Sequence, residues 1–295
     1  MSHSASVFRA YMQLARLSNS PTCLSNVLVG VSIGLAGSGA AVPWGPVAGM
    51  TVAVVLLYVG GMALNDVVDA PIDARERPNR PVPSGRIPRH HACVFAGVAL
   101  AAGVALAGLI SIVSGTFAGA LAASIVGYNV LHKRTAASVV LMGLCRSLVY
   151  ITAASAVAWP LDWDLAMPMV LALGAYVTAV TWVARGEATG GSPAVDRRLA
   201  MLMVAIALMP VLFIFPQRVE VMMLAGVLLI GWLIWTQRHV FVTPPDLKQA
   251  VMAWLAGICL VDAFYLALLE QPAFAAVAVA CFVATHLWQR VILGT

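Results

Sequence analysis

Long apolar stretches dominate the chain, and they restrict its possible folds more than any other feature. Most run for about 20 residues, the length that an α-helix needs to cross the hydrocarbon core of a bilayer. Apolar and polar residues do not alternate along them with a period of two, as they would in membrane β-strands. Of the 295 residues, 61% are hydrophobic and 10% are charged, whereas a soluble domain is about one-quarter charged. The sequence therefore predicts an all-α fold, a polytopic membrane bundle of nine to ten transmembrane helices.

The apolar stretches define ten candidate spans with no linker or low-complexity segment between them, so we expect a single transmembrane domain over residues 1–295. The candidate spans are 21–37, 47–66, 91–113, 115–132, 137–158, 166–184, 199–215, 218–236, 249–269 and 272–292.

Positive charge is concentrated in the N-terminal segment and in every second loop, with Arg218 the main exception. By the positive-inside rule, these segments face the cytoplasm. The net charge of +5 is thus explained by topology, and we expect no nucleic-acid partner. The five cysteines lie in or beside apolar runs without a CxxC pair, which is typical of small core residues.

Most of the unusual charge lies in one stretch, NDVVDAPIDARERPNRPVPSGR, from Asn65 to Arg86. Asn65, Asp69 and Asp73 are spaced i, i+4, i+8, and Asp66 precedes Asp69 by three residues. On a helix this spacing places the four side chains on one broad face. Clustered carboxylates repel one another, and a divalent cation relieves that repulsion. Oxygen ligands of this kind suit Mg²⁺.

A basic, proline-rich loop follows the acidic cluster, with arginines at 75, 77, 80, 86 and 89. Guanidinium groups bind phosphate in a bidentate way, so this loop fits a polyanionic substrate. The alternative is a solvated helix end whose acids pair with Arg75 and Arg77. We favour the functional interpretation, because acids at the end of a span in a charge-poor chain are functional candidates.

Two stretches resemble the UbiA superfamily of intramembrane prenyltransferases. NDVVDAPIDARERPNRPVPSGRI is similar to its first aspartate-rich motif, N-D-x-x-D-x-x-x-D followed by an Arg-Pro-x-x-x-Gly turn. GYNVLHKRTAASVVLMGLCRSLVY, Gly127 to Tyr150, resembles a second stretch in which a Tyr, here Tyr128, precedes Lys-Arg-Thr. The number and order of spans extend the resemblance over most of the chain, although the family usually has nine.

This resemblance implies a helical bundle around a cavity that opens to the cytoplasm and to lipid. It also implies Mg²⁺ and an isoprenyl diphosphate as ligands. We expect catalytic roles for Asn65, Asp66, Asp69 and Asp73, and metal ligation by the three aspartates together with Glu187. The expected diphosphate-binding residues are Asn26, Arg75, Arg80, Tyr128, Lys133, Arg134, Arg146 and Arg185.

The chain departs from the family pattern at the second acidic motif, which usually reads D-x-x-x-D. The corresponding stretch, TWVARGEATGGSPAVDRR from Thr181 to Arg198, has Glu187 and then Asp196 nine residues later. A second metal ion would be held poorly there, and Arg185 could replace it as a fixed cation. In this respect the chain looks most like an EboC-like branch of the superfamily.

Two charged residues lie within apolar runs, where an unpaired charge costs several kcal/mol. Arg146 either faces the cavity and binds the diphosphate or an acid, or forms a structural pair with Glu187 or Asp262. Asp262 is either a base on the acceptor side or a structural partner. Tyr128 and Tyr150 either line the cavity and stabilise a cation through their rings or anchor the chain at the interface.

The resulting prediction is a Mg²⁺-dependent prenyltransferase that moves an isoprenyl group from a diphosphate to a small aromatic or lipophilic acceptor. We expect an integral protein of the bacterial inner membrane with its active site facing the cytoplasm. The alternatives are a terpene cyclase or a phosphoribosyl-type transferase on the same fold, or a non-catalytic lipid or metabolite transport component.

Overall fold

The computed structural model of the chain describes residues 3–189 and 193–291. Within these ranges the chain is helical, and no strand is present. The short 3₁₀ segments are Leu17–Asn19 and Met209–Leu212. The α-helices are α1 (His3–Leu14), α2 (Pro21–Leu35), α3 (Trp44–Glu76), α4 (Arg89–Ile110), α5 (Ile112–Leu131), α6 (Ser138–Ala154), α7 (Trp163–Thr189), α8 (Pro193–Leu208), α9 (Val219–Phe241), α10 (Leu247–Leu268) and α11 (Pro272–Val291).

The all-α membrane fold predicted from the sequence is confirmed. Among the described residues, seven helices are long and apolar enough to cross a membrane: α3, α4, α5, α7, α9, α10 and α11. Three further helices fall in predicted spans but are shorter, with 15 residues in α2, 17 in α6 and 16 in α8. The number of crossings therefore stays a prediction.

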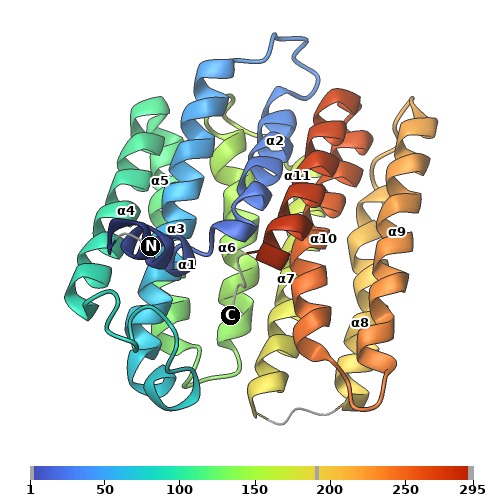
Figure 1. Cartoon of the computed structure of the whole chain (residues 1–295). Helices are drawn as coiled ribbons and strands as arrows, with labels where there is room; N and C mark the ends of the chain where they lie inside the picture. Colours follow the sequence, from blue (N-terminus) through green and yellow to red (C-terminus); the bar gives the residue numbers. More distant parts are fainter. Residues whose placement is uncertain (1–2, 190–192, 292–295) are drawn as a thin grey trace.

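The long helices run side by side as a bundle, and α1 lies across it beside α3 (Figure 1). α10 is the central element, since 83% of its apolar window is buried inside the protein and it packs against α2, α7, α9 and α11. α4 and α5 bury only 22% of theirs. Their exposed faces are apolar, as expected for helices that contact lipid.

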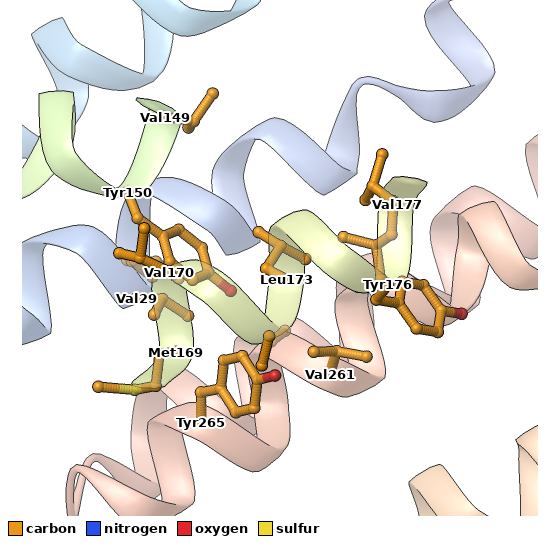
Figure 2. Packing of buried hydrophobic residues seen from close by; sticks show 14 of the residues in the cluster. Val29, Val149, Tyr150, Met169, Val170, Leu173, Tyr176, Val177, Val261 and Tyr265 are labelled. Atoms are coloured by element: carbon orange, nitrogen blue, oxygen red, sulfur yellow. The ribbon is translucent and has the colours of Figure 1, made fainter. Parts of the chain in front are cut away.

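The core between α2, α6, α7 and α10 is built from aliphatic side chains and three buried tyrosines (Figure 2). The hydroxyl of Tyr176 donates to the carbonyl oxygen of Trp254 over 2.9 Å. That of Tyr150 donates to the carboxylate of Asp262. Buried tyrosines need such partners, so this polar chemistry ties α6 and α7 to α10.

α6 and α7 approach closely at a pair of glycines. A Cβ added to Gly143 of α6 would collide with the Oγ1 of Thr178 and the carbonyl oxygen of Gly174, both in α7. Small residues at helix crossings are typical of membrane bundles, because packing rather than water exclusion drives association there. This crossing sets the position of the α6 side chains that reach the cavity described below.

Candidate functional site

The acidic cluster lies on the last three turns of α3, which is longer than the sequence predicted. The predicted span ended at residue 66, whereas the helix continues to Glu76 with Pro71 inside it. Proline has no N–H, so the carbonyl of Val67 loses its helical partner. The Nε of Arg89, at the start of α4, donates to that carbonyl over 3.1 Å. The helix therefore continues through the proline, and the acids keep helical spacing.

The three carboxylates of the cluster are buried, with exposed fractions of 3% for Asp66, 5% for Asp69 and 4% for Asp73. Arg75 and Arg77 are exposed at the end of the helix. The alternative of a solvated end paired with these two arginines is therefore wrong. A buried charge needs partners, and the partners come from other segments.

Arg80 bridges two of the carboxylates. Its Nη1 lies 2.6 Å from Oδ2 of Asp73 and 3.6 Å from Oδ1 of Asp66. Burial and the nearby Arg16 lower the pKa of Arg80, and the two carboxylates oppose that shift. An arginine keeps its charge under such shifts. The basic loop thus folds back onto α3 and places one positive charge against two of the three carboxylates.

Arg16 is a second cation at the cluster, and sequence reasoning treated it only as a topology signal. Its Nη2 donates to Oδ1 of Asn65 over 3.2 Å and to Oδ1 of Asp66 over 3.3 Å. The backbone of Arg16 is left-handed, with φ 45° and ψ 47°, and its carbonyl accepts a hydrogen bond of 3.0 Å from the hydroxyl of Tyr58. Its sequence signal is weak: it is the last cation before the first apolar run.

Asp69 pairs with His132, at the end of α5. The Nε2 of His132 lies 3.1 Å from Oδ1 and 3.3 Å from Oδ2 of Asp69, and its Nδ1 lies 3.0 Å from the carbonyl oxygen of Asn129. Both ring nitrogens face acceptors, an arrangement that the doubly protonated ring satisfies. The ring stacks on Tyr128 at a centroid distance of 5.3 Å. His132 is not among the site residues predicted from the sequence, and its signal there is weak, since it is a lone histidine beside Lys133 and Arg134.

The carboxylates are therefore divided into two groups rather than gathered around one point. Arg80 lies between Asp66 and Asp73, and Asp69 faces α5. Within the described parts of the chain, no three His, Cys, Asp or Glu side chains are placed to share one ion. The predicted triad of metal ligands is not assembled in this arrangement, because Arg80 supplies the positive charge.

A cavity of about 140 Å³ extends from this cluster into the bundle. Arg16, Asn65 and Tyr128 line its polar end, and Tyr58 and Arg146 also line it. The remaining wall is largely apolar and includes Val54, Leu57, Leu121, Ile125, Met142 and Val149. The cavity thus joins a charged mouth to an apolar interior.

Arg146 connects the cavity to a buried polar network. Its Nη1 donates to Oδ1 of Asn26 over 2.9 Å. The Nδ2 of Asn26 lies 2.9 and 2.8 Å from the two carboxylate oxygens of Asp262. Asn26 is fully buried and contacts Arg146, so its predicted link to a ligand is at most indirect. Tyr150 is also fully buried beside Asp262 and does not line the cavity.

Three other residues predicted to bind the diphosphate, Lys133, Arg134 and Arg185, do not line the cavity. Lys133 and Arg134 are exposed in the turn between α5 and α6. The Nη1 of Arg185 donates to the carbonyl oxygens of His132 and, over 3.2 Å, Thr135, so Arg185 holds this turn beside the cluster. Glu187 belongs to α7, but its side chain lies outside the described residues, as does Asp196.

The fold and site define an integral membrane bundle with buried carboxylates and cations beside the polar end of a largely apolar cavity. The model of the UbiA prenyltransferase family matches residues 24–255. The chain belongs to this family, and the resemblance found in its sequence is confirmed.

Similarity to individual relatives is partial. The chain is 42% identical over 103 residues to a digeranylgeranylglyceryl phosphate synthase from Methanopyrus kandleri, covering 35% of this chain and 36% of that protein. It is 30% identical over 148 residues to a protoheme IX farnesyltransferase from Shewanella amazonensis, covering 48% of each. The chain thus matches between about a third and a half of the length of these curated relatives.

Solved structures share the fold. A UbiA homologue from Aeropyrum pernix superposes with a TM-score of 0.68 at 17% identity, over 84% of this chain and 97% of that one. A homologue from Archaeoglobus fulgidus bound to GPP and Mg²⁺ gives 0.63 at 15% identity, over 88% and 99%. At such identities the likeness concerns the fold alone.

Proposed function

We propose that the protein is a Mg²⁺-dependent intramembrane prenyltransferase that transfers an isoprenyl group from an isoprenyl diphosphate to a lipophilic acceptor. The observation that carries the proposal is the junction of two environments in one cavity. Arg16 and Asn65 line its polar end beside the buried carboxylates, which Arg16 and Arg80 contact, and an apolar wall continues inward past Tyr58. A molecule with a polyanionic head and a hydrocarbon tail fits a cavity that has a charged end and an apolar interior.

The side chains at the acidic cluster have the oxygen donors that a magnesium ion requires. Asp66, Asp69 and Asp73 are buried oxygen donors, and Oδ1 of Asp69 has no well-formed hydrogen bond among the described residues. Mg²⁺ is usually held by one or two carboxylates, waters and the phosphates of the substrate, so a complete protein cage is not required. When bound, the metal ion neutralises charge that develops on the departing diphosphate.

The chain's own side chains supply the rest of the reaction environment. Arg16 and Arg80 stand at the carboxylates as fixed cations and would hold the phosphate oxygens. The apolar wall excludes water from the reactive allylic carbon. The rings of Tyr58 and Tyr128 line the cavity, where their faces would stabilise positive charge on that carbon.

The orientation of the site follows from charge. The 77–88 loop beside the cluster and the α9–α10 loop lie at the same end of the bundle (Figure 1). The first loop is rich in arginine and the second is flanked by Arg238 and Lys248, so by the positive-inside rule we expect both in the cytoplasm. For the acceptor, the names of the matched relatives favour a prenylglyceryl phosphate or a porphyrin over a small aromatic molecule.

The test is a product profile by mass spectrometry. Purified protein in lipid nanodiscs is incubated with Mg²⁺, allylic diphosphates of ~10 to ~20 carbons, and a membrane lipid extract to which a prenylglyceryl phosphate is added. A lipid whose mass increases by one isoprenyl group, with release of diphosphate, supports transfer. A hydrocarbon or alcohol derived from the donor alone indicates cyclisation or hydrolysis. Neither diphosphate release nor a new lipid with any donor would contradict the proposal.

A further inference from the structure

Arg146 lines the cavity beside Tyr58. Its Cζ is 5.9 Å from the ring centroid of Tyr58. Tyr58 precedes Asn65 by seven residues on α3, which places it about 10 Å deeper along the helix axis at a rise of ~1.5 Å per residue. The cavity is therefore lined by two cations, which define an upper level, Arg16 beside Asn65, and a lower level, Arg146 beside Tyr58.

An isoprenyl chain gives no reason for the lower cation. A donor whose diphosphate lies at Asp66 and Asp69 would pass its hydrocarbon tail beside Arg146, where a guanidinium gains nothing from it. A charged group within a membrane bundle is costly and usually serves a ligand or a partner. The question is whether Asp262 needs Arg146 as its partner.

The hydrogen bonds of Asp262 come from other residues, and Arg146 acts on it only through Asn26 and across space. Its carboxylate accepts from Ser25 over 2.5 Å, from Asn26 over 2.9 and 2.8 Å, and from Tyr150. All these donors are uncharged, and together they satisfy the carboxylate. Arg146 contacts the network through Oδ1 of Asn26, and no ion pair joins it to Asp262 among the described residues. A guanidinium has five N–H donors, and Arg146 is only partly buried where it lines the cavity.

We propose that Arg146, oriented by Asn26 and Asp262, binds the anionic group of the acceptor, which is a lipophile bearing a phosphate or a carboxylate. This inference rests on the proposed function. The upper level holds the diphosphate of the donor, and the lower level holds the charge of the acceptor beside the donor's hydrocarbon chain. Asp262 and Asn26 are positioning residues that fix the guanidinium in the cavity wall.

The test measures binding of radiolabelled dodecyl phosphate, dodecanoate and dodecanol to the full chain in nanodiscs. Saturating Mg²⁺ and inorganic diphosphate occupy the upper level. We expect the wild-type protein to bind at least one of the two anions about tenfold more tightly than dodecanol, as expected for a charged hydrogen bond. The anion that binds more tightly identifies the acceptor group. Arg146→Gln keeps a donor for Asn26 and removes the charge, so it should abolish the preference.

Three further variants separate the roles. Arg146→Lys should retain part of the preference, and Asp262→Asn should weaken it while the charge at position 146 remains. Arg218→Gln, the same substitution at an exposed position in the segment before α9, should change nothing. Melting temperatures report whether each variant is folded, and Arg146→Met, which also removes the charge, replaces Arg146→Gln if the latter does not fold.

Two results would overturn the inference. If Arg146→Gln weakens binding of Mg²⁺ and inorganic diphosphate by more than about threefold, the residue belongs to the donor site. If it changes neither diphosphate nor anion binding, its role is structural. Failure of the proposed function gives a different result, because the wild-type protein would not bind Mg²⁺ and inorganic diphosphate. The preference for an anion over dodecanol can still be measured in that case, since this assay also works without Mg²⁺ and diphosphate.

Discussion

Arg80 Nη1 lies 2.6 Å from Oδ2 of Asp73, and both side chains are almost fully buried. The same nitrogen reaches Asp66 at 3.6 Å. One guanidinium thus compensates two carboxylates that a metal ion would also bind. Arg80 and Mg²⁺ are expected to compete for the same negative charge, and this competition gives the first prediction.

Arg80→Gln should make the protein depend on Mg²⁺ for stability. Removing one partner of a buried ion pair costs about 3 kcal/mol, which lowers the melting temperature in EDTA by roughly 5 °C or more. Added Mg²⁺ should restore more of this loss than it adds to the wild-type protein, because two uncompensated carboxylates then face each other. Thermal unfolding followed by tryptophan fluorescence measures both values.

The matched control is Arg77→Gln, at the start of the same loop but exposed, which should leave the melting temperature unchanged with and without Mg²⁺. Equal melting temperatures for Arg80→Gln and the wild-type protein in EDTA would show that the bridge contributes no stability.

Arg16 combines a charge with a left-handed backbone, and two substitutions separate these properties. Arg16→Ala and Arg16→Gly both remove the guanidinium beside Asp66, so both should weaken Mg²⁺-dependent binding of a prenyl diphosphate by about tenfold. Only alanine is strained at φ 45°, which costs about 1 kcal/mol. The alanine variant should therefore melt at a lower temperature than the glycine variant. Wild-type affinity in both variants would exclude Arg16 from the site.

Gly143→Ala should destabilise the bundle, because its Cβ has no room against α7. Gly119→Ala in α5 is the control, since nothing lies within 4 Å of the added Cβ. Overpacking of this kind costs about 1–3 kcal/mol, and we expect a lower melting temperature for the first variant alone. Similar melting temperatures for the two variants would mean that α6 and α7 lie further apart than described.

The sequence predicted the fold class because apolar length is a local property. Candidate spans such as 21–37 and 249–269 lie close to α2 and α10. The end of α3 was misplaced by ten residues, because charge and Pro71 mark a helix end locally. The structure shows a buried continuation, supported by Arg89 from the next helix.

The sequence predicted the positions of the acids, which depend on their spacing along one helix. It did not predict Arg16 and His132 as their partners, because these two residues come from distant segments. The i, i+4, i+8 pattern correctly placed the acids on a helix. Arg16 contacts Asp66 across 50 positions, and Asp69 meets His132 across 63; no local pattern indicates either pair. Asn26, Arg146 and Asp262 were singled out as polar groups within spans, but their connection depends on the packing of α2, α6 and α10.

The central claim is that the carboxylates at the end of α3 hold an isoprenyl diphosphate through Mg²⁺. The most direct measurement is equilibrium binding of radiolabelled geranylgeranyl diphosphate to wild-type protein and to Asp69→Asn, each with Mg²⁺ and with EDTA. Asp164→Asn, exposed in the first turn of α7, is the matched control. We predict that wild-type protein and the control bind at least about tenfold more tightly with Mg²⁺, and that Asp69→Asn loses this dependence. Equal binding by Asp69→Asn, or binding by wild-type protein that does not respond to Mg²⁺, would contradict the claim.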